Sequence, residues 1–124
     1  MRFYKNGQNC IFIIIHYTKI MNLQLDKNRT DEERFELAYM KKGLAKIKKD
    51  AIKCANEHSI ELIRHEADKM VKKLLEFGAE NKNADLNLRE VYLNACYARN
   101  HARNVEEIQL AMNRIINSLE KINI

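Results

Sequence analysis

The side chains best suited to bind a metal ion stand at helical spacing. His58, Glu61 and His65 occur at i, i+3 and i+7, with Asp68 three residues further on, so one continuous helix would place them on one face. Imidazole and carboxylate groups arranged in this way can bind zinc or a related transition metal. However, this face points away from the apolar stripe described below, and no second cluster closes the site. The pattern favours a solvated polar face, and a metal-binding helical bundle is the second alternative function.

A second pattern is basic and could contact phosphates or carboxylates. Lys42, Lys46, Lys49 and Lys53, the lysine stripe, recur at steps of four, three and four. In the hairpin described below, Arg114 and Lys121 come to the same end as this stripe. The chain has 22 basic and 17 acidic residues, so its net charge is only +5, and the stripe has no side chain suited to read bases. A nucleic-acid-associated protein is the first alternative function, and an acidic protein or an anionic membrane surface would fit the same residues.

Catalytic chemistry finds little support. The chain has no Gly-rich phosphate loop, no GxSxG elbow and no HExxH motif. Its three cysteines form no CxxC pair, and Cys54 and Cys96 lie within helical patterns, where a thiol acts as a small apolar group. We therefore expect a protein that is not an enzyme, needs no cofactor and keeps free thiols in the cytoplasm.

Two long apolar stripes at steps of three and four must position these side chains. The first runs from Met40 to Phe77 and the second from Leu88 to Ile122, and the chain has no proline. Thr30 with Glu33 makes a capping box ahead of the first stripe, and Gly78 is a good terminator after it. Stripes of this period are typical of amphipathic helices and predict an all-α fold.

The two stripes match when they are folded antiparallel around residues 78–87. Apolar positions then pair in order along their whole length, which predicts a long helical hairpin resembling a coiled coil. The first stripe has the longer steps, so two straight helices cannot stay in register. We expect a bend or break near residues 56–59, and a full break would give three helices, over residues 31–56, 59–77 and 87–122.

A hairpin two helices thick leaves a second apolar band uncovered. This band consists of Leu62, Val71, Leu75, Tyr92, Cys96 and Ile116, and Tyr97 adds an aromatic side chain on the outer face. An uncovered band of this size usually marks an interface. The sequence therefore predicts a homodimer in which two hairpins form a helical bundle. The alternative is that the N-terminal segment covers the band.

Residues 1–29 differ in composition from the helical domain expected over residues 30–124. Asn6-Gly7 could form the turn of a short hairpin ahead of the apolar run at residues 11–15. That run is too short to span a bilayer, so no integral membrane segment is expected. The alternative is an irregular extension, with Met21 as the natural start.

Taken together, these patterns predict a small helical interaction protein that binds a protein partner through its helix surfaces. An adaptor, a chaperone and an inhibitor would all fit this description.

Overall fold

The computed structural model describes residues 30–122, which form an all-helical bundle. Its helices are α2 (Asp31–Ala55), α3 (Ile60–Glu76), α4 (Leu86–Asn100) and α5 (Val105–Lys121). No strand occurs in this part of the chain, so the predicted all-α class is confirmed. The expectations for residues 1–29, a short hairpin and a cover for the apolar band, lie outside the described residues.

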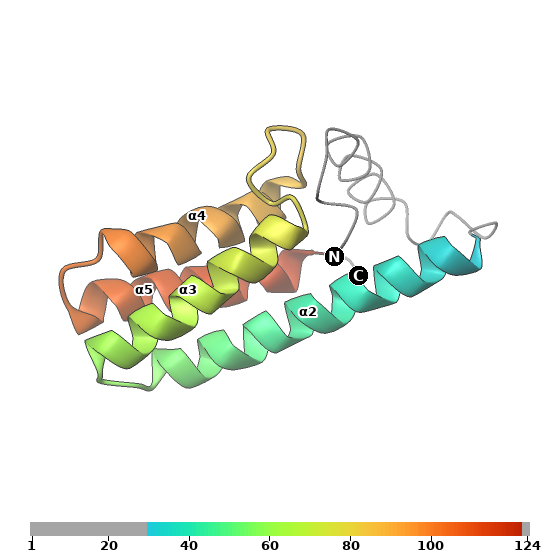
Figure 1. The fold of residues 1–124 in the computed structure, drawn as a ribbon. Helices are drawn as coiled ribbons and strands as arrows, with labels where there is room; N and C mark the ends of the chain where they lie inside the picture. Colours follow the sequence, from blue (N-terminus) through green and yellow to red (C-terminus); the bar gives the residue numbers. More distant parts are fainter. Residues whose placement is uncertain (1–29, 123–124) are drawn as a thin grey trace.

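The four helices run back and forth beside one another (Figure 1). α4 packs most extensively with α5, and the contacts of α3 with α4 and of α2 with α5 come next. α2 and α3 follow each other in the chain but touch far less. α2 has 25 residues against 15 to 17 in the others, and its first turns project beyond the bundle. None of the helices within residues 30–122 combines the length and the apolar character that a transmembrane span requires.

The first arm is divided into α2 and α3, which confirms the break predicted near residues 56–59. Ser59 starts α3, because its hydroxyl accepts the backbone N–H of Leu62 at 3.3 Å. One Glu57 carboxylate oxygen accepts the N–H groups of His58 at 3.0 Å and of Ser59 at 3.3 Å. These local bonds replace the backbone bonds that a continuous helix would make.

The predicted single helix over residues 87–122 is wrong, because the chain breaks again at residues 101–104. The Asn104 side-chain oxygen accepts the N–H of Glu107 at 2.9 Å, and the Glu107 carboxylate accepts the N–H of Arg103 at 2.8 Å. The bond from the Arg103 N–H is the main reason that the pKa of the Glu107 carboxyl lies below its usual value. This reciprocal capping starts α5 and ends any continuous helix.

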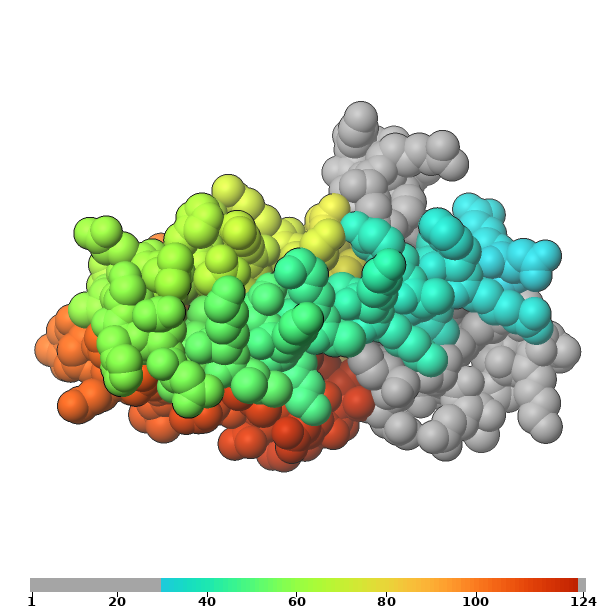
Figure 2. Space-filling model, turned by 90° about the horizontal axis from the view of Figure 1, so that it is seen from below, coloured from blue at the N-terminus to red at the C-terminus, as the bar shows by residue number. Residues whose placement is uncertain are grey.

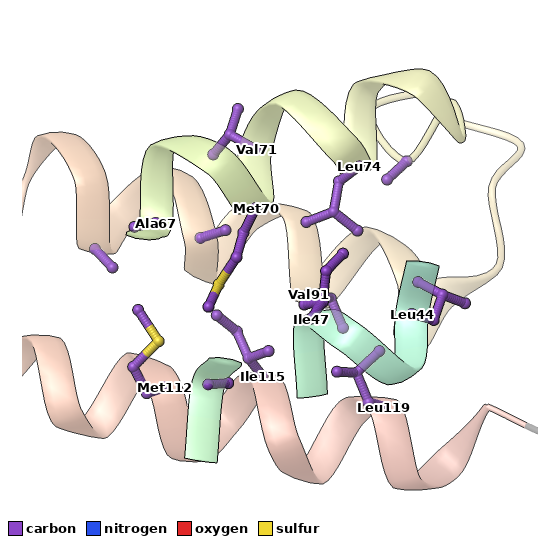
Figure 3. Packing of buried hydrophobic residues seen from close by; sticks show 14 of the residues in the cluster. Leu44, Ile47, Ala67, Met70, Val71, Leu74, Val91, Met112, Ile115 and Leu119 are labelled. Carbon is purple, nitrogen blue, oxygen red and sulfur yellow. The ribbon is translucent and has the colours of Figure 1, made fainter. Parts of the chain in front are cut away.

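Both arms break at the same end of the molecule, so the expected extended hairpin is folded in half (Figure 1). The segments that the hairpin pairs still pack together, α3 on α4 and α2 on α5, and folding adds the contact of α4 with α5. Met70 of α3 and Ile115 of α5 point toward each other across the core (Figure 3). Cys54 and Ala111 lie beside the predicted stripes and are also buried, because the bundle has a second layer of helices.

The turn between α3 and α4 is a helix stop. Gly78 has φ 69°, its N–H donates to the Leu75 carbonyl, and the Ala79 N–H donates to the Leu74 carbonyl, both at 3.0 Å. This pair of bonds is a Schellman motif, and its positive φ favours glycine. Asp85 then starts α4, with its carboxylate accepting two N–H groups of the first turn.

Candidate functional site

α2 and α3 leave a groove of about 240 Å³ between them. Its floor consists of Ile47 from α2 and Met70 from α3, which both belong to the core. α2 crosses the face seen in Figure 2, from cyan to green, with α3 in lime to yellow along its upper edge. The groove residues are Gly43, Lys46, Ile47, Asp50, Glu66, Lys69, Met70 and Lys73. The groove therefore has an apolar floor and a charged rim.

Phe77 packs against Gly43, one of the groove residues, and is held there by its neighbours. A Cβ atom on Gly43 would lie 2.5 Å from the Phe77 Cζ, so only glycine lets α2 pass this close to the ring. The Tyr39 ring meets Phe77 edge-on, with 5.9 Å between the centroids. Lys73 donates to the Tyr39 hydroxyl at 3.0 Å and pairs with Glu76 at 2.9 Å, and these two bonds raise the pKa of Lys73.

The rim lysines are paired only with acids of their own helices. Lys46 lies 3.3 Å from Asp50, four residues on, and Lys69 lies 3.4 Å from Glu66, three residues back. The two lysine side chains are 73% and 61% exposed. Such exposed pairs contribute at most about 1 kcal/mol, so a partner's carboxylate can replace them at little cost.

One member of the lysine stripe, Lys46, lines this groove. Lys42, Lys46, Lys49 and Lys53 are all exposed. Within residues 30–122, Lys42, Lys49 and Lys53 make no ion pair. These three lysines do not line the groove and lie on the exposed surface of α2 outside it.

Cys54 lies in the core and is an unreactive thiol. Burial is the main cause that raises its pKa to about 11, and the nearby carboxylates of Glu66 and Asp50 add to this shift. A thiol with this pKa stays protonated at neutral pH and is a weak nucleophile. Cys54 is therefore a packing residue of the core, and the residues that line the groove include no cysteine.

Arg114 and Lys121 do not join the lysine stripe. They line a different, more polar groove between α4 and α5, together with Asn87, Asn94 and Asn117 among others. The structure thus separates Arg114 and Lys121 from the lysine stripe, although the hairpin pairing predicts them at the same end. Residues 30–122 also hold 17 basic and 16 acidic side chains, a net charge of only +1.

The predicted interface residues fall into three groups. Val71 is 1% exposed and belongs to the core, so it is not part of an uncovered band. Tyr92, Cys96 and Ile116 are half-buried and pack against the core. The exposed members are Leu62, Leu75 and Tyr97. Folding the hairpin in half therefore covers much of the surface that was expected to drive dimerisation.

The candidate metal ligands are not brought together. His58 lies in the loop between α2 and α3, so it does not share a helix face with Glu61 and His65. Within residues 30–122, no three His, Cys, Asp or Glu side chains converge as a metal site requires.

Sequence reasoning missed most of the groove. The signal that could have found it is Gly43, a glycine within the first helix that has no turn or cap to explain it. Lys69 and Lys73, spaced one turn apart on α3, complete the opposite rim. In the sequence alone, these two lysines cannot be distinguished from lysines on any solvated helix face. Their role on the rim depends on the position of α3 beside α2.

The chain matches no known protein family, no curated protein and no solved structure.

Proposed function

We propose that this protein is a non-enzymatic interaction module that binds an acidic amphipathic helix of a partner protein in the groove between α2 and α3. The observation that carries the proposal is the loose contact of these two consecutive helices. The other consecutive pairs pack closely over the core, whereas α2 and α3 leave an open groove above Ile47 and Met70. An adaptor, a chaperone or an inhibitor would each use such a site.

The shape of the groove fits a helix. It runs between two antiparallel helices, and Gly43 to Asp50 spans about 10 Å along α2, or two helical turns. An incoming helix can place apolar side chains at i, i+3 or i+4, and i+7 along this length. Its anchors would cover the floor at Ile47 and Met70 and would add a third helix to the pair.

The charge of the rim selects an acidic partner. Lys46 lines the groove from α2, and Lys69 and Lys73 line it from α3. Glutamates flanking the apolar stripe of a partner helix would meet lysines on both rims. Such charge complementarity raises the association rate and disfavours basic partners.

The groove supports a protein partner better than a nucleic acid. The floor of the groove consists of the apolar side chains of Ile47 and Met70, which apolar anchors of a helix would cover and a phosphate backbone would not. The low net charge of the bundle and the separation of Arg114 and Lys121 from the lysine stripe point the same way. Nucleic-acid binding and the expected homodimer stay predictions.

A display library of helical peptides, selected against the full-length protein, tests the proposal directly. We expect the enriched peptides to carry Asp and Glu beside apolar residues at i, i+4 and i+7, with dissociation constants on the order of micromolar. Scrambled peptides of the same composition lack the apolar face and should not bind. Enrichment of basic peptides, or equal binding of the scrambled controls, would contradict the proposal.

A further inference from the structure

The exposed side of α2 differs in composition from the rest of the surface. From Arg34 to the end of the helix, every exposed side chain is either basic or apolar. These residues, the outer face of α2, are Arg34, the lysine stripe, Phe35, Ala38, Ala45 and Ile52. At 100° per residue they fall within an arc of about 120°, so they form one continuous face. The other helices each expose a glutamate, Glu61 on α3, Glu90 on α4 and Glu106 on α5.

The acids of α2 do not neutralise its outer face. Asp31 and Glu32 are exposed, but they belong to the first turn, where a negative charge suits the N-terminal end of the helix dipole. Glu36 is buried, and Asp50 pairs with Lys46 beside the groove. The outer face therefore carries a net positive charge along the rest of the helix.

Lys42, Lys49 and Lys53 contribute nothing to the stability of the bundle. Within residues 30–122 they make no ion pair, whereas Lys48, on the side of α2 toward α5, pairs with Glu120 at 3.8 Å. Like charges one helical turn apart, such as Lys49 and Lys53, repel each other and destabilise a helix. Three unpaired lysines on one face thus point to an anionic binding partner rather than to a role in folding.

Large apolar side chains flank these lysines. Phe35 is 74% exposed and Ile52 is 46% exposed, about 25 Å apart along α2. The phosphate backbone of a nucleic acid would pair with the lysines but would leave both apolar side chains in water. An anionic lipid surface fits both groups, because its headgroups attract lysines and its interface takes up exposed aromatic and aliphatic side chains.

We propose that the outer face of α2 docks this protein on a membrane surface that contains anionic lipids. Lys42, Lys49 and Lys53 contact the headgroups, and Phe35 and Ile52 enter the interface between headgroups and acyl chains. The helix lies along the membrane plane and stays in the bundle, since its other side belongs to the core. None of these five residues lines the α2/α3 groove, so the proposal does not depend on what the groove binds. α4 lies diagonally across the bundle from α2 and faces away from the lipid (Figure 1).

Sedimentation of the full-length protein with lipid vesicles tests this proposal. We expect binding to phosphatidylcholine vesicles that contain about 30% phosphatidylserine, with an affinity that falls as salt is added, and little binding to pure phosphatidylcholine. The test variant replaces the three unpaired lysines, Lys42→Gln, Lys49→Gln and Lys53→Gln. One lysine near an anionic surface contributes about fivefold, so the variant should bind at least about tenfold more weakly.

The matched control removes the same charge from other parts of the surface. It carries three substitutions of exposed lysines on α3, in the following turn and on α5, Lys72→Gln, Lys82→Gln and Lys121→Gln. This control should retain most of the vesicle binding. An equal loss in both variants would show attraction by net charge and would overturn the proposal, as would a test variant that binds as well as the wild type.

A single tryptophan then shows which surface meets the lipid. The chain has no tryptophan, so Phe35→Trp introduces the only one. Its fluorescence should shift to the blue on vesicles with phosphatidylserine, because the indole enters the apolar interface. Leu93→Trp on α4, where Leu93 is 45% exposed, should show no shift. Vesicle binding without a shift at position 35 would overturn the proposal. So would a lack of vesicle binding at low salt, and binding to duplex DNA in that case would assign the lysines to a phosphate backbone.

Discussion

Phe77→Ala is expected to destabilise the bundle by about 3–5 kcal/mol. The Phe77 side chain is 1% exposed and is among the largest fully buried side chains of the described core. Tyr39 contacts it edge-on, and α2 approaches it at Gly43, where even one added carbon would clash. The surroundings are backbone and packed rings that cannot collapse easily, so truncation should leave a cavity. Urea unfolding followed by circular dichroism measures this loss.

Leu75→Ala is the matched control for Phe77. Leu75 lies two residues earlier, near the end of the same helix, but is 40% exposed. Its truncation should cost much less, on the order of 1 kcal/mol, because little buried contact is lost. Equal losses for the two variants would mean that Phe77 is not the packed end of the α2/α3 contact.

Reversing two charges on the groove rim should have the largest effect on binding. Lys46→Glu with Lys69→Glu places a negative charge on each rim, next to Asp50 and Glu66. An acidic peptide from the library would then meet four carboxylates instead of two ion pairs. We expect its affinity to fall at least about tenfold, mainly through a slower association rate. Both lysines are more than half exposed, so far-UV circular dichroism should not change.

Lys82→Glu with Lys121→Glu provides a control with the same change in net charge. Both residues are exposed, but Lys82 lies in the turn between α3 and α4, and Lys121 lines the groove between α4 and α5. If the acidic peptide binds between α2 and α3, this variant should retain most of the affinity. An equal loss in both variants would indicate attraction by net charge rather than a defined site.

The local pattern of the chain predicts most of the fold. Nearly every residue of the two apolar stripes is buried, and the break at residues 56–59 follows from the mismatch in their steps. The sequence also contains a signal for the second break, at residues 101–104. Asn104-Val-Glu-Glu107 is a capping sequence that starts α5. The apolar steps of three and four continue from Ala98 through Ala102 and Val105 to Ile108, so the stripe itself shows no interruption at this loop.

The groove could not be predicted from periodicity, because it depends on how far two helices stand apart. The hairpin pairing predicts that α2 contacts α5 and that α3 contacts α4. It does not predict the distance between α2 and α3. The distance between α2 and α3 is set by how the two arms fold in half. For the same reason, the hairpin pairing places Arg114 at the same end as the lysine stripe, whereas Arg114 lines the groove between α4 and α5.

An NMR titration of the isotope-labelled full-length protein with an enriched acidic peptide is the sharpest test of binding in the groove. We expect the largest backbone shift changes to follow the groove, at Gly43, Ile47 and Asp50 on α2 and at Glu66 and Met70 on α3. Amides lining the groove between α4 and α5, such as those of Asn94 and Asn117, should move little. Changes centred on α4 and α5, or spread evenly over the bundle, would contradict binding between α2 and α3.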